Sequence, residues 1–450
     1  MEKTKNIILA ALVLLSVFLS WQLMTYRPQY DYLSQTRYDQ LEGIAQKREW
    51  TELFKPHLVV FHLSPGEMRG AYPHTFVHDR VVAEMKEWEL EPPQPLEDTE
   101  RKEWAALYRE REGLEFLFWE GLPLSVLTSL FKQEDGTPSP SPWATASFKR
   151  LLLYQDPRYS DELSLLFIGE TKEVLKSRVT NLSLRQLDRL LDWGQSLTPL
   201  YAIGQGEEGD LFDPGLYVNS QPVTMQGKTY RYRRIPIHHM LSYLSIDPSL
   251  ARRIEEKGDT VLYLHGSRGI KVNRSFSIMT YFHPFLEQHP KENRAVVDTE
   301  RAVQFVNQHK GWDREFLLSR ISRTPSEELT QLEFKEYLGA YPVFAQEETP
   351  PLNRITIDLK PDRVVGYSRS LLERGELFTQ EEVVLPSGQE LEEKLIEADV
   401  DLSDLRHIRL GYRLTLDGVF LKYEPNWVID FINQERWFIN DLGQVGGNGD

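Results

Sequence analysis

The sequence holds one pair of histidines at a spacing that metal ligands often use. His74 and His78 are four residues apart, so on a helix both imidazoles would lie on one face and could bind a metal ion. The zinc motif of this type also has a glutamate directly after the first histidine, but Thr75 stands there. The surrounding AYPHTFVHD favours a loop or strand, so we do not expect a metal here. The adjacent His238 and His239 would point in opposite directions on a strand.

Residues 204–209 match the G-x-G-x-x-G pattern of dinucleotide-binding loops, and the LYAI before them could form a strand. That motif needs a helix directly after it, because the helix N-terminus contacts the pyrophosphate. Pro214 would end such a helix early, and the carboxylates of Glu207, Glu208 and Asp210 would repel a pyrophosphate. We interpret the segment as a solvated acidic loop, with bound calcium as a minor alternative.

Two further motifs have a structural explanation that we prefer. HGSRG at residues 265–269 resembles a nucleophile elbow, but that motif places glycine where this chain has His265, so we expect a strand that turns at Gly266. YRYRR at residues 230–234 interleaves aromatic and basic side chains, as single-strand nucleic-acid binders do. A strand would place the tyrosines on one face and the arginines on the other, and this is the interpretation we favour.

The composition excludes several kinds of chemistry. The 450 residues include no cysteine, which rules out disulfides, cysteine-ligated zinc, iron–sulfur clusters and thiol catalysis. The formal net charge of −16 argues against nucleic acid as a partner, because phosphate backbones attract lysine and arginine. Charged residues make up 27% and aromatic residues 11%, as in folded rather than disordered chains.

The order of apolar and polar residues predicts an α+β fold with mainly antiparallel sheets. Strands are expected at 57–63, 148–156, 163–170, 228–237, 260–266, 275–282 and repeatedly from 354 onward, and a strand followed by a helix at 114–131. Helices are expected at 182–197, 248–258 with Gly258 as C-terminal cap, 298–312 with Asp298 as N-cap, and 387–399. We expect a polar helix within residues 30–50 as well.

Residues 6–26, NIILAALVLLSVFLSWQLMTY, carry no charge. A helix of about 20 apolar residues spans a hydrocarbon core of about 30 Å. Lys3 and Lys5 predict a cytoplasmic N-terminus by the positive-inside rule, and Trp21 and Tyr26 lie near the far end, where such rings favour the headgroup level. The sequence therefore predicts a single-pass anchor, with the bulk of the chain extracellular.

The spacing of two serines distinguishes an uncleaved anchor from a cleaved signal peptide. Signal peptidase needs small residues three before and one before the cut, whereas Ser16 and Ser20 are four apart. We therefore expect the stretch to stay on the protein. The same spacing places both serines on one helical face, which we expect to pack against partner helices. The alternative is that each hydroxyl bonds a carbonyl of its own helix.

Six stretches together resemble one family. They are SWQLMTYRPQY (20–30), FVNQHKGWD (305–313), FKEYLGAYPVF (334–344), VVLPSGQEL (383–391), IRLGYRL (408–414) and KYEPNWVIDF (422–431). In order and spacing they resemble the YycH family, the extracytoplasmic regulators of the WalK–WalR two-component system of low-GC Gram-positive bacteria. The resemblance covers nearly the whole chain, although each motif alone is weakly specific.

The resemblance implies a non-enzymatic membrane protein without cofactor, metal or catalytic residues. It would act on the sensor histidine kinase WalK together with a YycI-like membrane protein, and so on cell-wall metabolism. The expected parts are a cytoplasmic tip and transmembrane anchor (1–28), an N-terminal extracellular domain (29–190), a central extracellular domain (191–345) and a C-terminal YycI-like domain (346–450). The alternative is an anchored extracellular enzyme, such as a metal-dependent hydrolase acting on the cell wall, which would need polar groups converging in a pocket.

The topology makes the first testable prediction. Protease added to intact protoplasts should digest the part of the chain from about residue 30 onward, because the basic flank orients the N-terminus inward. Lysing the protoplasts is the control, since it exposes both sides. A mature chain that begins beyond residue 20 by N-terminal sequencing would contradict the uncleaved anchor.

Overall fold

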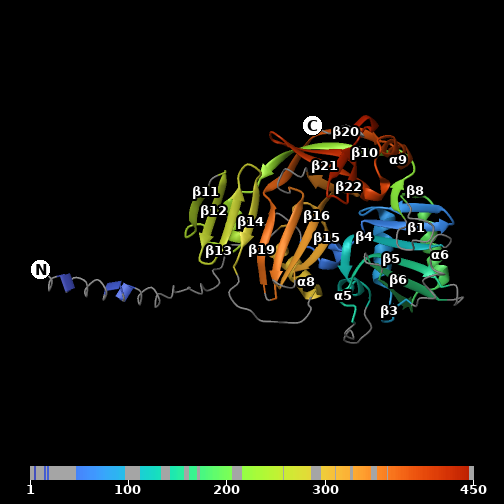
Figure 1. Ribbon diagram of the computed structural model, residues 1–450, viewed down its shortest axis with the longest axis horizontal. Helices are drawn as coiled ribbons and strands as arrows, with labels where there is room; N and C mark the ends of the chain where they lie inside the picture. The colour runs from blue at the N-terminus through green and yellow to red at the C-terminus, as the bar shows by residue number, and fades with distance from the viewer. Residues whose placement is uncertain are drawn as a thin grey trace. The chain divides into compact units, whose positions relative to one another are not determined.

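The computed structural model describes most of the chain beyond residue 46 (Figure 1). The described residues are 5–6, 15–16, 18–19, 47–96, 112–132, 142–156, 162–169, 173–204, 215–256, 258–284, 295–309, 311–324, 328–345, 352–361 and 363–444. The chain divides into two compact units, Met1–Glu42 and Gly43–Asp450. The fold described here is that of the second unit.

Most of the expected anchor lies outside the described residues, and so do Ser20, Trp21, Tyr26 and most of the helix expected within 30–50. Ser16 has helical backbone and an exposed side chain. Among the residues that the structure describes, none belongs to a helix long and apolar enough to cross a membrane. The anchor therefore stays a prediction, and so do the domain boundaries.

The first sheet has nine strands in the described residues, in the order β3-β7-β6-β5-β4-β1-β2-β8-β9. Its strands are β1 Leu58–Ser64, β2 Glu67–Ala71, β3 Gln94–Pro95, β4 Gly113–Pro123, β5 Ser147–Gln155, β6 Leu163–Gly169, β7 Val174–Val179, β8 Thr198–Ile203 and β9 Leu216–Asn219. The accompanying helices are α2 Trp50–Leu53, α3 Phe76–Lys86, α5 Leu124–Thr128 and α6 Leu184–Gly194. Helix α6 packs closely on β1, because a Cβ added at Gly194 would lie 2.5 Å from the Phe61 ring.

The second sheet has fourteen described strands. The main order is β11-β12-β13-β14-β19-β18-β16-β17-β21-β22-β10-β20, with β15 paired to β16 and β23 paired to β22. The strands are β10 Val223–Arg234, β11 Arg252–Glu256, β12 Thr260–His265, β13 Arg268–Asn273, β14 Ile278–Phe282, β15 Glu315–Thr324, β16 Leu329–Leu338, β17 Tyr341–Ala345, β18 Arg354–Lys360, β19 Arg363–Ser370, β20 Leu372–Leu385, β21 Leu405–Asp417, β22 Phe420–Phe431 and β23 Arg436–Ile439. Helices α7 Ile237–Tyr243, α8 Ala295–Gln308 and α9 Gly388–Glu397 accompany it, with short 3-10 turns at Leu402–Asp404 and Leu442–Gln444. The pairing of β17 with β21 is parallel.

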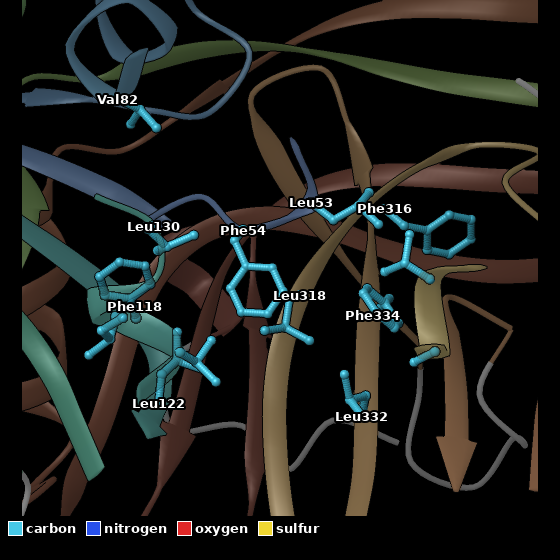
Figure 2. Packing of buried hydrophobic residues seen from close by; sticks show 14 of the residues in the cluster. Leu53, Phe54, Val82, Phe118, Leu122, Leu130, Phe316, Leu318, Leu332 and Phe334 are labelled. Carbon is cyan, nitrogen blue, oxygen red and sulfur yellow. The ribbon is translucent and has the colours of Figure 1, made fainter. Parts of the chain in front are cut away.

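One hydrophobic cluster contains residues of both sheets. Figure 2 shows part of it, with Phe54 after α2 drawn between Phe118 of β4 and Leu318 of β15. Phe334 of β16 belongs to the same cluster. Since each of these side chains is buried, this core is shared between the two sheets. A second large cluster, which includes Trp427, is separate from it.

The structure confirms the α+β class, the mainly antiparallel sheets and most expected elements. The segment 248–258 is an exception, because the predicted helix is wrong. Arg252–Glu256 is strand β11 and pairs with β12, so that Ile254 lies opposite Leu262. Gly258 has φ +82° and lies in the turn between the two strands rather than at a helix end. Here, hydrogen bonding to a neighbouring strand outweighs the helical propensity of arginine and glutamate.

The predicted N-cap of the next helix is also wrong. Helix α8 begins at Ala295, so Asp298 lies in its first turn. Its carboxylate accepts hydrogen bonds from Arg301 and from the Thr330 hydroxyl, both at 3.3 Å. A carboxylate in this turn still favours the helix, because the N-terminal end of the macrodipole is positive.

From the sequence we expect Pro425 at a strand start or an edge, because it lacks an N–H, and Trp427 to be buried, because the apolar VIDFI follows it. Pro425 in fact lies inside β22, opposite Tyr412. On the other side of β22, the described pairing with β10 reaches Tyr423 and that with β23 begins at Trp427. The proline, which lacks an N–H, falls between these two partners and removes no ladder bond on that side. Trp427 is buried, as predicted, at 1% exposure.

Because Trp427 is buried, replacing it should destabilise the fold as the loss of a core residue does. Trp427→Ala is expected to lower the free energy of unfolding by about 3–5 kcal/mol, because it leaves a cavity and removes the indole hydrogen bond to the Pro386 carbonyl. Urea denaturation of the purified chain measures this. Trp437→Ala, at a partly exposed tryptophan of β23, is the matched control and should cost less. An unchanged midpoint for Trp427→Ala would instead mark Trp427 as a surface contact.

Candidate functional site

The structure places the two spaced histidines differently from the prediction. His78 lies in helix α3 and is fully buried, whereas His74 precedes the helix with φ +62°. His78 Nε2 lies 2.9 Å from the Pro56 carbonyl oxygen, which can only accept, so this nitrogen donates. Burial lowers the pKa of His78, against the opposing effect of the Asp79 carboxylate 3.3 Å from its Nδ1. We interpret His78 as a residue that fixes the start of α3 against the preceding loop.

The other sequence motifs are structural where they are described. Gly266 has φ +60° in the turn between β12 and β13, and the YRYRR segment lies in β10, as predicted. His238 and His239 lie in α7, so the strand considered for them is wrong. Residues 205–214 lie outside the described part, and the acidic-loop interpretation stays a prediction. Among the described side chains, no group of three or more His, Asp or Glu is arranged to hold a metal.

A group of charged and aromatic side chains lies between the two sheets. We call Trp119, Lys335, Tyr337, Phe344 and Arg409 the cation–aromatic seam. The Trp119 indole donates a hydrogen bond to the Tyr337 hydroxyl at 2.8 Å. The Lys335 ammonium lies 4.5 Å from the Trp119 ring centroid, and the Arg409 guanidinium lies 4.3 Å from it. Both cations also lie near the Phe344 ring, at 4.7 and 5.4 Å.

The charges of the seam are unevenly matched. Arg409 forms an ion pair with Asp430, whose other carboxylate oxygen lies 2.5 Å from Arg436 Nε. Burial would raise the pKa of Asp430, but Arg409 and Arg436 outweigh it and hold that pKa below its usual value. For Lys335, burial and the neighbouring Arg409 lower the pKa to about 7. One carboxylate thus pairs with two arginines. Lys335 lies against two aromatic rings, and the charges of Glu333 and Asp430 only partly offset the cost of burying its ammonium.

A lysine with a pKa near neutrality can act as a base or nucleophile. In the seam, however, the ammonium faces Trp119 and Phe344, whose apolar rings cannot take part in proton transfer. The residues around it come from β4, β16, β17 and β21, which belong to both sheets. We therefore interpret the seam as a joint between the sheets. The sequence does not predict the seam, because Trp119 and Arg409 lie far along the chain from Lys335, Tyr337 and Phe344.

A second feature is exposed, and we call residues 376–382 of β20 the β20 edge. Strand β20 is the last strand of its sheet and pairs with β10 on one side, and no described strand pairs with the other side. Phe378 is 65% exposed and its ring centroid lies 4.6 Å from that of Phe420 at the start of β22. The nearby Leu377 and Val419 are 50% and 47% exposed. Exposed apolar groups on an open strand edge are typical of a contact site.

The β20 edge also carries negative charge. Glu376, Glu381 and Glu382 are exposed on the same strand. Charge on an edge strand prevents pairing with an identical strand, because like charges would lie opposite each other. The edge is thus better suited to a strand or loop with basic residues than to a second copy of itself.

Comparisons with known proteins cover nearly the whole chain. The family model described as "YycH protein, N-terminal domain" matches residues 2–196, and "YycH protein, C-terminal domain" matches residues 214–442. The two-component system WalR/WalK regulatory protein YycH of Bacillus subtilis (strain 168) is 20% identical over an alignment 450 positions long, which covers 95% of this chain and 94% of that protein. The crystal structure of YycH from Bacillus subtilis matches with a TM-score of 0.66 at 16% identity, over 88% of this chain and 98% of that one. This likeness establishes a common fold.

The shifted pKa of Lys335 predicts how stability depends on pH. The pKa of a lysine in the unfolded chain is about 10.4, whereas the pKa of Lys335 in the fold is about 7. Between these values the unfolded chain binds more protons, so the free energy of unfolding should rise with pH. Lys335→Met should raise the melting temperature at pH 7 and flatten its increase toward pH 10.

Differential scanning calorimetry between pH 7 and 10 measures this effect. Lys271→Met changes an exposed lysine of β13 and is the control, which should keep the wild-type slope. A Lys335→Met chain that melts at a lower temperature throughout this range would show that the cation–aromatic contacts outweigh the cost of burial.

Proposed function

The chain belongs to the YycH family, and from that premise we propose that it is a non-enzymatic, membrane-anchored regulator of a WalK-like sensor histidine kinase. The observation that carries this proposal is the match of both YycH domain models over most of the chain. The related protein of Bacillus subtilis is named a WalR/WalK regulatory protein, which supports the same system as the target. Through that kinase the chain would influence cell-wall metabolism.

We place the N-terminus in the cytoplasm, residues 6–26 in the cell membrane and the bulk of the chain outside. The uncharged stretch after Lys3 and Lys5 supports this topology. In the membrane, the face with Ser16 and Ser20 would contact helices of the kinase and of a YycI-like membrane protein. Small residues let such helices approach closely, and their hydroxyls can form bonds between helices.

Outside the membrane, the β20 edge would contact the YycI-like protein. The apolar Phe378 and Leu377 supply contact area, and the open strand supplies backbone hydrogen-bonding groups. The glutamates of the edge select a partner strand with basic residues over a second copy of this chain. The family resemblance also implies that the C-terminal region shares the fold of YycI.

Regulation by contact requires a difference in affinity between two kinase states. A tenfold change in the ratio of active to inactive kinase needs about 1.4 kcal/mol of differential binding. A pair of helix contacts at about 0.6–2 kcal/mol each is enough for such a change. The regulator therefore needs no chemical step.

An anchored wall hydrolase is the competing function. It would need convergent acids, bases or metal ligands, and the described side chains that could hold a metal do not gather in this way. No described feature favours this function over the regulator. The two differ in their dependence on the anchor, because an exported hydrolase would keep acting on the wall without it.

The transmembrane contact can be tested by adding bulk to the serine face. Ser16→Leu with Ser20→Leu should leave insertion intact but separate the packed helices, so kinase-dependent reporter output should shift to the level of a deletion strain. Single substitutions could be silent because each contact is weak, so the double variant is the decisive one. Ala10→Leu with Ala11→Leu adds similar bulk away from the serine face and is the matched control. Wild-type output and co-purification in the serine variant would exclude this face.

The extracellular contact can be tested at the exposed phenylalanine. Phe378→Glu should weaken co-purification of the YycI-like protein by about tenfold or more, as loss of an aromatic hot spot does. Stability should change by only about 0.5 kcal/mol, because the side chain is 65% exposed. Leu250→Glu, at a residue 61% exposed outside the β20 edge, is the control. Equal co-purification of the two variants would show that the edge is not the contact.

A further inference from the structure

A surface pocket lies beside α8, away from both the seam and the β20 edge. It has a volume of about 430 Å³, within the range of small-molecule sites at ~300–1,000 Å³. Helix α8 forms one wall, strands β13, β14 and β19 form another, and the turn after α7 contributes Ser245. Ser245 has φ +56°, so the backbone at this rim is held in a conformation that serine rarely adopts.

The pocket is lined by cationic groups. These groups are Arg268 of β13, Arg301 of α8 and Arg363 of β19. His283 and His309 also line the pocket, but burial lowers the pKa of both, so their rings are neutral near pH 7. None of the described residues that line it is acidic, in a chain whose net charge is −16. Three guanidinium groups from three separate elements thus lie around one pocket.

The arginines differ in the hydrogen bonds and ion pairs that they make with the rest of the protein. Arg301 lies 3.3 Å from the Asp298 carboxylate and donates to the Pro361 carbonyl at 2.9 Å. Arg268 makes no ion pair with any described residue. Both Arg268 and Arg363 lie close enough to lower the pKa of His283, although burial has the larger effect. The field in the pocket is therefore positive at the place where a ligand would enter.

Other residues of the pocket suit the remainder of an organic ligand. Gln304 and Gln308 supply neutral amide groups from α8. Tyr281 and Phe305 supply aromatic surface, and their ring centroids are 6.1 Å apart. The pocket thus combines a charged part with an apolar part, as small-molecule sites commonly do.

We infer that this pocket binds a small organic phosphate. A tetrahedral phosphate accepts hydrogen bonds from several directions and so matches guanidinium groups on separate elements, whereas one arginine fork is enough for a planar carboxylate. The phosphate lies against Arg268 and Arg363, and the organic part lies against Tyr281 and Phe305. The inference does not depend on the regulatory function, because binding is measured without kinase.

Calorimetric titration of the purified full-length chain in detergent tests the inference. The probes are glycerol 3-phosphate, a monoester, and glycerophosphoglycerol, a diester with the chemistry of a lipid headgroup. Saturable binding of either probe is expected. Arg268→Gln with Arg363→Gln should weaken it at least about tenfold, because each charge-assisted hydrogen bond contributes strongly.

Arg252→Gln with Arg320→Gln removes the same charge outside the pocket and should keep wild-type affinity. Preference for the monoester would identify a free metabolite as the natural ligand, and preference for the diester would identify a headgroup; both outcomes support the site. Binding should also raise the pKa of His283, which NMR of labelled histidines measures. No binding at about 10 mM of either probe, equal binding by both double variants, or tighter binding of citrate would overturn the inference.

Discussion

The contact between β4 and the second sheet is the constraint on which the rest of the described fold depends. Successive side chains of a strand point to opposite faces, so β4 presents Phe118 to the shared core and Trp119 to the seam. The indole hydrogen bond to Tyr337 fixes the register of this contact, and the cations of Lys335 and Arg409 lie near the indole ring. A strand buried on both faces holds the two sheets in one arrangement.

Strand β16 connects this contact to the rest of the second sheet through a buried carboxylate. Its Glu336 is fully buried, pairs with Arg314 at 2.5 Å and accepts a hydrogen bond from the Tyr423 hydroxyl at 2.9 Å. Removing one member of such a pair typically costs about 3–5 kcal/mol, because the other charge stays buried. Tyr423 lies on β22, which pairs with β10, which in turn pairs with β20. The buried pair and the β20 edge therefore belong to one continuous sheet, in which the pairing with β10 positions β20.

Local pattern allowed much of the fold to be predicted from the sequence. Apolar spacing identified α6, and apolar runs identified β1, β5 and β6, because burial imposes these periods directly. The same reasoning from local pattern failed at Arg252–Glu256. This segment is charged and mostly exposed, so its sequence shows no burial pattern, and it is a strand only because it pairs with β12. The seam and the arginine pocket could not be predicted, since distant residues such as Trp119 and Arg409 meet only after the chain has folded. The family resemblance, in contrast, rested on the order of short motifs and needed no contacts.

The central claim is that the chain acts through contact with a kinase in the same membrane, and the anchor tests it most directly. Replacing residues 1–28 by a cleavable signal peptide would export the body of the chain without the proposed membrane helix. The measurement is the phosphorylated fraction of the WalR-like response regulator, compared among cells with the full chain, the exported body and neither. We expect the exported body to resemble the deletion, because the helix contacts are lost. A phosphorylated fraction equal to that with the full chain would contradict the account.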